Sequence, residues 1–306
     1  MTSTPPAPPS RWQAFWDRGG LARAVLVAAT YLALYLAGGQ LVGALFRDRV
    51  DADDLFASAE SVAFGLLAPL VLGAVALVVF VTSVRWWGPL FGPQPVRGRR
   101  WMWIAPVLVV VPVALRLLGI DYASYAAGVV AVTLLAGLFV GFVEELLTRG
   151  IVVKMLRDSG RSEWVVMVVS SLVFALLHSA NLLSGMSPAT VGFTVVYTFG
   201  FGVAMYLTLR VTGSLLWPIL LHGLFDPTLF LATGGIDEVA EGAAVNPLLT
   251  LAGPFNFLFI ALGVVALFLA RAVDVRRAGS PPGTGTGTDS SAGATGPAPA
   301  TDRPVA

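Results

Sequence analysis

Eight apolar stretches, each about as long as a membrane-spanning helix, constrain the fold of this chain most strongly. A helix needs roughly 20 apolar residues to cross the hydrocarbon core of a bilayer, and only helices and closed barrels satisfy their backbone hydrogen bonds there. Charged residues make up only 12% of the chain, about half of their share in soluble domains. The sequence therefore predicts an all-α, polytopic membrane protein with about eight transmembrane helices, at 21–46, 60–84, 101–120, 125–149, 164–183, 188–210, 214–232 and 248–271.

The positive charges between the spans predict the orientation of the chain. If the N-terminus is cytoplasmic, sixteen of the nineteen Lys and Arg residues fall on the cytoplasmic side, and only Arg47, Arg49 and Arg116 fall outside. The positive-inside rule then places both termini in the cytoplasm and predicts an even number of spans. We expect a multi-pass protein of the cell membrane, in which Arg116, near the outer end of the third span, snorkels to the surface.

The segments outside the spans have simpler interpretations. The cytoplasmic N-terminal segment 1–20 carries Trp12, Phe15 and Trp16 at helical spacing, which fits either a short interfacial helix or a plain aromatic anchor. The fourth span has no helix breaker after its end, so its helix is expected to continue to about Arg157. Residues 278–306 consist mostly of Gly, Thr, Ser, Ala and Pro and predict a disordered cytoplasmic tail.

A few polar residues inside the apolar spans are the main functional signal. Glu144 and Glu145 are adjacent in the fourth span, and each costs about 3 kcal/mol to place at the centre of a membrane helix. The chain has only two histidines, His178 and His222, and both lie in apolar stretches, as does Asp226. Ionisable groups within membrane helices usually face the bundle interior and serve a function, so we expect a polar site buried in the helix bundle.

Helical geometry separates the two glutamates. Glu145 and Arg149 are four residues apart and can pair on one face of the helix, where we expect a supporting ion pair at the membrane interface. Glu144 is rotated away from that face by about 100°. One carboxylate is therefore tied down, while the other remains available for chemistry.

The positions along the spans predict which residues share a depth. Counting from Gly160 in the loop between spans four and five, Glu144 lies sixteen residues back and His178 eighteen residues forward, so antiparallel helices would bring them level. His222 is only nine residues past Gly213. Either the seventh span starts deeper, or the hairpin of spans four and five projects into the cytoplasm and the site lies near the cytoplasmic face.

These residue types suit two kinds of hydrolysis. A carboxylate beside an imidazole can deprotonate a water that attacks an amide carbonyl, while a second histidine stabilises the oxyanion. The same types also suit zinc, with Glu144, His178 and His222 as ligands. The absence of cysteine excludes a thiolate site, and no His-Glu-x-x-His is present to form a zincin helix. The residue types alone leave the metal question open.

The order of the three motifs resembles the CPBP family, the CAAX protease and bacteriocin-processing (Abi) family. The motifs are Glu-Glu-x-x-x-Arg at Glu144, Glu145 and Arg149, Phe-x-x-x-His at Phe174 and His178, and His-x-x-x-Asp at His222 and Asp226. Each is weak alone, but all three match in residue type and order on separate spans. The resemblance identifies 125–235, spans four to seven, as a catalytic core, preceded by three helices in 21–120 and followed by the span 248–271.

The resemblance implies an intramembrane endopeptidase of the CAAX prenyl endopeptidase type. Glu144 with His178 would activate the water, and His222 with Asp226 would stabilise the oxyanion or position the substrate. The supporting residues would be Glu145, Arg149 and Phe174. Members of the family have been described both as metalloproteases and as metal-free, glutamate-dependent proteases. Prenyl-processing members often have Asn at the position of Asp226, and an ionised carboxylate can only accept hydrogen bonds.

Two other functions are compatible with the same residues. A non-catalytic scaffold or bacteriocin-immunity protein would keep the fold without turnover, and a proton-coupled transporter could use buried Glu, His and Asp as a relay. Against a transporter, no pair of Gly- or Pro-broken spans repeats between the two halves. The expected partners are a membrane peptide or protein substrate and the lipid bilayer, and the net charge of +1 gives no indication of nucleic acid. The oligomeric state has no signal in the sequence.

Overall fold

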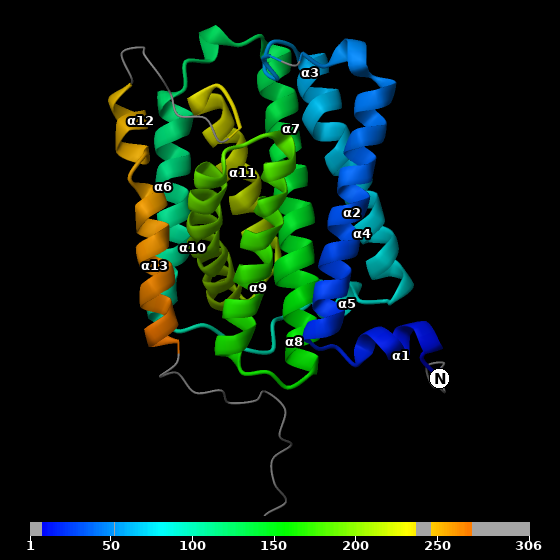
Figure 1. The fold of residues 1–306 in the computed structure, drawn as a ribbon. Helices are drawn as coiled ribbons and strands as arrows, with labels where there is room; N and C mark the ends of the chain where they lie inside the picture. Colours follow the sequence, from blue (N-terminus) through cyan, green and yellow to red (C-terminus); the bar gives the residue numbers. More distant parts are fainter. Residues whose placement is uncertain (1–7, 52, 237–245, 271–306) are drawn as a thin grey trace, which may run out of the picture. The chain divides into compact units, whose positions relative to one another are not determined.

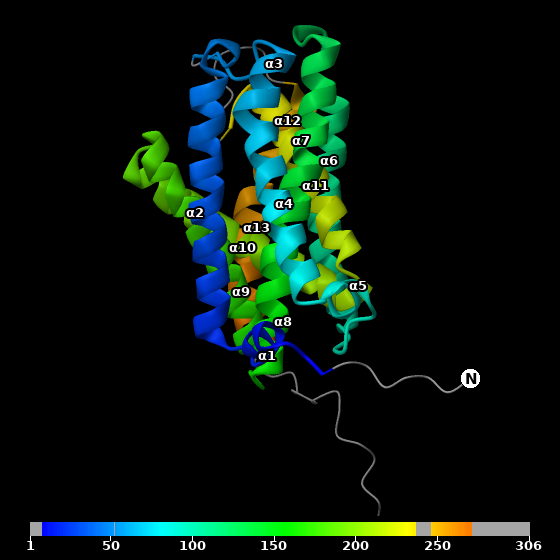
Figure 2. The same cartoon turned by 90° about the vertical axis from the view of Figure 1, so that its right-hand side faces the viewer.

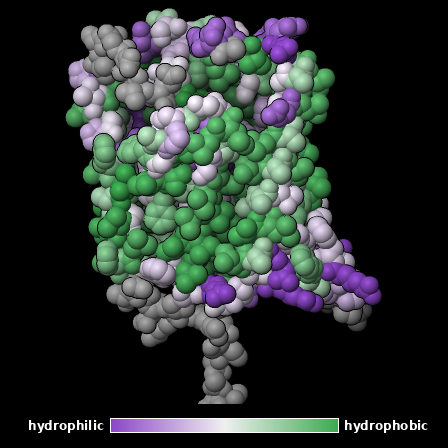
Figure 3. All heavy atoms as spheres, in the orientation of Figure 1, coloured by the Kyte–Doolittle hydropathy of each residue, from purple (hydrophilic) through white to green (hydrophobic). Residues whose placement is uncertain are grey.

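The computed structural model describes residues 8–51, 53–236 and 246–270, and within these ranges the chain is helical throughout, without a strand. Eight segments are long and apolar enough to cross a membrane: Leu21–Leu45, Ala59–Ser83, Arg100–Gly119, Ala127–Asp158, Glu163–Ser184, Pro188–Thr212, Leu216–Thr233 and Pro247–Leu269. Each corresponds to one predicted span, which confirms the polytopic all-α fold. Apolar side chains cover the middle of the molecule as a broad belt (Figure 3). The predicted tail 278–306 lies outside the described residues.

Several spans consist of more than one helical segment. The first is α2 (Leu21–Leu45), the sixth α10 (Pro188–Thr212) and the seventh α11 (Leu216–Thr233). The second span consists of α3 (Ala59–Val62), η2 (Ala63–Leu67) and α4 (Ala68–Ser83), and the third of η3 (Arg100–Trp103) and α6 (Ile104–Gly119). The fourth consists of α7 (Ala127–Glu145), η5 (Leu146–Val152) and α8 (Val153–Asp158). The fifth consists of α9 (Glu163–Leu177) and η6 (His178–Ser184), and the eighth of α12 (Pro247–Ala252) and α13 (Phe255–Leu269). Short helices α1 (Arg11–Asp17), α5 (Trp87–Phe91), η1 (Arg47–Arg49) and η4 (Tyr122–Ser124) lie outside the spans.

Helix α7 runs through the middle of the bundle, with α2 and α4 on one side and α6, α10 and α11 on the other (Figure 1). Its main partner is α11, while α10 packs between α9 and α13. Helices α1, α5 and α8 lie at one end of the bundle, and α3 and α12 lie at the opposite end, as both views show (Figures 1 and 2). The fourth, fifth and seventh spans, which carry the motif residues, therefore meet in the interior.

The N-terminal aromatic residues form the helix α1, so the helical alternative is confirmed. Ser10 caps it, because its hydroxyl accepts from the Gln13 backbone N–H while the Gln13 side chain bonds back to Ser10. Trp16 is buried against Phe80 of α4, with ring centroids 5.1 Å apart, and Trp12 remains half exposed. The helix is thus fixed to the bundle on one face and presents an aromatic face on the other.

The fourth span continues without a break to Asp158, as predicted, and reaches 32 residues. At 1.5 Å per residue that helix is about 48 Å long, well above a hydrocarbon core of about 30 Å. Its α8 end lies at the level of α1 (Figure 1). This length favours the second explanation for the depth of His222, in which the hairpin of spans four and five extends beyond the membrane on the α1 side.

Glycines let α7 and α11 approach closely where the motif residues meet. A methyl group at Gly141 would lie 2.3 Å from the Ile219 carbonyl oxygen and 2.5 Å from the Gly223 nitrogen, and Gly137 faces Pro227 equally closely. Gly137 and Gly141 form a small-x-x-x-small pattern, which permits close helix contact in membranes. Backbone atoms of α11 fill the space that a side chain would need, so the distance between the two helices depends on these glycines.

Replacing Gly141 with Ala is expected to destabilise the fold by about 1–3 kcal/mol, the usual cost of overpacking a tight interior. The clashing atoms belong to the backbone of α11 and cannot move without shifting that helix. The free energy of unfolding in detergent micelles measures the effect. Gly43→Ala is the matched control, because no atom lies within 4 Å of a methyl group there. Equal stability of the two variants would show that α7 and α11 do not pack as described.

Candidate active site

Glu145 connects two of the three motifs. Its Oε1 lies 3.0 Å from Nη1 of Arg149 and 2.8 Å from Nδ1 of His222, and both glutamate and arginine side chains are 0% exposed. The predicted pair of Glu145 and Arg149 is therefore present. The pair is enclosed by the bundle, since α11 packs against α7 and α10 contacts the segment η5 that carries Arg149. The contact with His222 joins the first motif to the third, a link that the sequence analysis did not predict.

Arg149 is enclosed by groups that suit a buried guanidinium. Its Cζ lies 4.4 Å from the centroid of the Phe174 ring, a cation–π contact. Its Nη1 also donates to the Thr148 hydroxyl, which in turn donates to the Glu144 carbonyl oxygen. Gly202 on α10 leaves room for Nη2, since a methyl group there would lie 3.0 Å from that atom. This glycine thus makes room for the guanidinium between α10 and η5.

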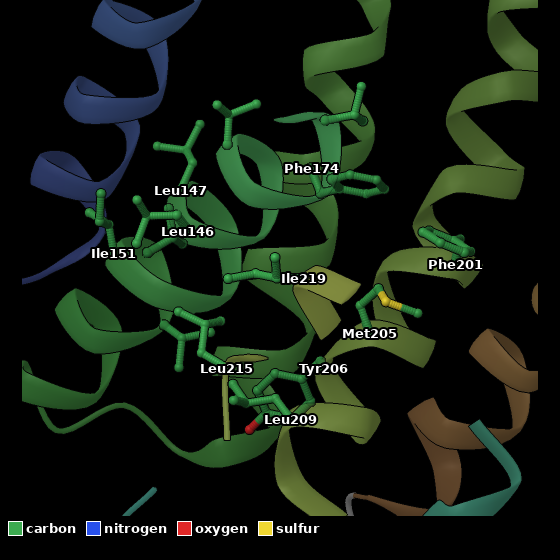
Figure 4. Packing of buried hydrophobic residues seen from close by; sticks show 14 of the residues in the cluster. Leu146, Leu147, Ile151, Phe174, Phe201, Met205, Tyr206, Leu209, Leu215 and Ile219 are labelled. Carbon is green, nitrogen blue, oxygen red and sulfur yellow. The ribbon is translucent and has the colours of Figure 1, made fainter. Parts of the chain in front are cut away.

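The helix widens to a π-helix at Leu146–Val152, immediately after the two glutamates. Such turns are rare and are often found at functional sites. Figure 4 shows the apolar side chains around this segment: Leu147 and Ile151 lie on its α2 side, and Ile219 of α11 lies on its other side. Because these leucines and isoleucines are almost fully buried, the polar residues beside them have a fixed frame.

His178 has a defined tautomer. Helix α9 ends at Leu177, and the backbone N–H of His178 bonds to the carbonyls of Ala175 and Leu176, which leaves the Phe174 carbonyl to its side chain. Nδ1 lies 3.0 Å from that carbonyl oxygen. A carbonyl only accepts, so Nδ1 carries the proton and donates. In a neutral imidazole, Nε2 is then free to accept a proton.

His222 has carboxylates at both ring nitrogens. Nδ1 faces Glu145, and Nε2 lies 3.3 Å from Oδ2 of Asp226 and 3.8 Å from Oε2 of Glu144. The rings of Phe174 and Phe201 pack edge-on against the imidazole, and the histidine is only 1% exposed. A protonated His222 would donate a hydrogen bond through each ring nitrogen to a carboxylate, so this arrangement suits an imidazolium cation.

Glu144 remains available, as the helical geometry predicts. Among the described residues, Oε2 of each glutamate has no hydrogen-bond partner, but Glu145 is held through Oε1 by Arg149 and His222. Within the described residues, the close charge contact of Glu144 is with His222 and not with His178. Glu144 and His178 instead line the same cavity.

This cavity has a volume of about 420 Å³ and contains all four residues to which the sequence analysis gave catalytic roles, Glu144, His178, His222 and Asp226. Its walls come from α2, η2, α4, α7, α9, η6, α10 and α11. Besides these polar residues, the lining includes leucines from α2, α4, α9 and α11. A peptide with apolar side chains and one polar bond to be attacked fits this arrangement.

The described residues contain no grouping of metal ligands: no three or more His, Cys, Asp or Glu side chains there are arranged to hold a metal ion. We therefore derive no catalytic step through a metal.

Arg116 does not snorkel to the surface, contrary to the expectation. It is only 3% exposed, and its Cζ lies 4.5 Å from the centroid of the Phe225 ring. Helices α11 and α12 both pack against α6, so the side chain has no path to water. The guanidinium thus packs against α11, the helix that carries His222 and Asp226.

Comparison with known proteins supports the motif assignment. Residues 126–228 match the family model for Type II CAAX prenyl endopeptidase Rce1-like proteins. The matched segment contains every motif residue from Glu144 to Asp226, and the match confirms the resemblance to the CPBP family. Neither the search of curated proteins nor the search of solved structures found a match. The match leaves α2, α4 and α6 outside the segment, although α2 and α4 contribute to the cavity wall.

Proposed function

We propose that this membrane protein is an endopeptidase that hydrolyses peptide bonds of membrane-associated or lipidated peptides with a water activated by Glu144 and His178. The observation that carries the proposal is the convergence of Glu144, with an unpartnered Oε2, and His178, with a free Nε2, on one cavity beside His222. Two proton acceptors and one donor at a cavity large enough for a peptide segment are what amide hydrolysis requires.

The reaction begins with water held between Glu144 and His178. One of these groups takes a proton as the water oxygen bonds to the amide carbon, and the carbonyl electron pair moves onto oxygen. The Nε2–H of a protonated His222, shared with Asp226 at 3.3 Å, stabilises that oxyanion. When the intermediate collapses, the C–N bond breaks and the nitrogen receives the proton, which gives a carboxylate and an amine.

Asp226 and Glu145 hold His222 from its two sides. An ionised carboxylate only accepts hydrogen bonds, so Asp226 positions the imidazole and does not stabilise the oxyanion directly. Arg149 and Phe174 then fix Glu145 and the two rings. This division of roles follows from the contacts at Nδ1 and Nε2 of His222.

The substrate class follows from where the cavity lies. Its lining includes leucines from α2 and α11, two helices long and apolar enough to span a membrane, which suits a lipidated or membrane-bound peptide that reaches the site from the bilayer. The distribution of Lys and Arg between the spans supports a cytoplasmic position for the end of the bundle that carries α1 and α8. The site would then lie toward the cytoplasmic leaflet.

Cleavage of quenched fluorescent peptides, some lipidated, by the purified protein in lipid tests this function. We expect the wild type to cleave, and His178→Ala to lower kcat about 100-fold or more, because general-base catalysis typically contributes that much. Leu183→Ala is the matched control on the same helical segment, since Leu183 is 76% exposed. A scaffold would be favoured by two results together. The folded wild type would cleave none of the peptides, and the wild type and His178→Ala would give equal protection in a host immunity assay.

A chelator arm of the same assay tests the metal question. Because no suitable group of ligands is present among the described residues, we expect cleavage to continue in the chelator. Activity that is lost in the chelator and restored by added zinc would keep the peptidase but assign it a metal.

A further inference from the structure

Two tyrosines on α2 face the cavity from outside the segment that matches the family. Tyr31 and Tyr35 are four residues apart on one side of the helix, and their rings stack at 6.2 Å with an interplanar angle of 17°. Both line the cavity that contains Glu144. The family match begins at residue 126, so none of the three motifs includes them.

The hydroxyl groups of these tyrosines have no protein partner. Buried tyrosines usually donate to a nearby oxygen, and in this chain the hydroxyls of Tyr122 and Tyr125 donate to backbone carbonyls, each at 3.0 Å. Within the described ranges, no hydrogen bond joins the Tyr31 or Tyr35 hydroxyl to another protein group. Two donors at the wall of a cavity therefore remain available to whatever occupies it.

Both tyrosines share the lining of one cavity with Glu144. The Tyr31 hydroxyl uses the space left by Gly73 of α4, where a methyl group would lie only 2.9 Å from its oxygen. A glycine at this point keeps room for the hydroxyl beside the cavity.

The proposed hydrolysis needs more donors than the motifs supply. Glu144 and His178 accept protons, Asp226 only accepts, and His222 offers one N–H to the cavity. Oxyanion sites generally combine two or more donors that face the oxygen as it gains charge. The hydroxyls of Tyr31 and Tyr35 are donors of the required kind in the same cavity.

We propose that Tyr31 and Tyr35 are catalytic residues that donate hydrogen bonds to the carbonyl oxygen of the bound peptide as it becomes an oxyanion. This inference rests on the proposed function. It assigns α2, which the family match does not cover, a direct part in the reaction, and it compensates for the Asp at position 226.

Kinetics of Tyr31→Phe and Tyr35→Phe in the peptide assay test the inference. Each variant removes one oxygen and keeps the ring, and we expect kcat to fall about 100-fold with KM within about twofold, as for loss of an oxyanion donor. Tyr122→Phe is the matched control, because its hydroxyl lies in an exposed loop. Melting temperatures of all variants in detergent should equal that of the wild type.

The outcomes separate the inference from the proposed function. Wild-type cleavage with full kcat in both Phe variants would overturn the role of the tyrosines and leave the peptidase intact. A raised KM at unchanged kcat would also overturn it, because that pattern reports ground-state binding. Absence of cleavage by the wild type would overturn both. If Tyr31→Phe fails to fold because Tyr31 is buried against Gly73, Tyr35→Phe decides alone.

Discussion

Replacing Glu144 with Gln is expected to lower kcat for peptide cleavage at least about 1,000-fold, near the upper range for loss of a general base. Gln has almost the same shape but cannot take a proton from water. Oε2 of Glu144 has no hydrogen-bond partner in the described structure, so the change should cost little stability. The measurement is kcat and KM for the best peptide, with the melting temperature recorded in parallel.

Glu60→Gln is the matched control for this variant. Glu60 is exposed and pairs with Arg49 at the opposite end of the bundle from α1, so its replacement should leave kcat unchanged. A folded Glu144→Gln variant that cleaves at the wild-type rate would remove Glu144 from the mechanism. A transporter would instead lose transport in this variant while neither protein cuts peptide.

Replacing Glu145 with Ala is expected to reduce the free energy of unfolding by about 3–5 kcal/mol, the typical cost of removing one partner of a buried ion pair. The change leaves the Arg149 guanidinium buried without its carboxylate and removes the acceptor of His222 Nδ1. Cleavage should fail as well, because His222 loses its orientation. Denaturant titration in detergent micelles measures the stability change.

The exposed pair of Arg49 and Glu60 supplies the control for stability. Its side chains are 57% and 60% exposed, and surface pairs contribute only about 0–1 kcal/mol, so Glu60→Ala should have little effect. A loss of less than about 1 kcal/mol in Glu145→Ala would contradict the buried network, because such a value is typical of an exposed pair.

The fold could be predicted from the sequence because its signals are local. Each apolar stretch of sufficient length became a span, and the absence of a breaker after Arg149 correctly predicted one long fourth helix. The pairing of Glu145 with Arg149 likewise followed from a four-residue spacing on one helix. Such patterns depend on the periodicity of a single segment and need no knowledge of its neighbours.

The parts of the site that could not be predicted depend on contacts between spans. The bond from Glu145 to His222, the burial of Arg116 and the position of Tyr31 at the cavity all require the relative rotation of several helices, which no single segment encodes. One signal was present but unused: Gly137 and Gly141 form a pattern that predicts close packing in membranes. It would have pointed to the surface of α7 that meets α11.

Hydrolysis by a water molecule at Glu144 and His178 is tested most directly by mass spectrometry of peptide products formed in ¹⁸O-labelled water. The wild type in lipid and Glu144→Gln are compared, each shown to be folded. We expect wild-type products whose new carboxylate carries one ¹⁸O, and intact peptide with Glu144→Gln. Intact peptide with the folded wild type, or labelled products at the same rate from both proteins, would contradict this mechanism.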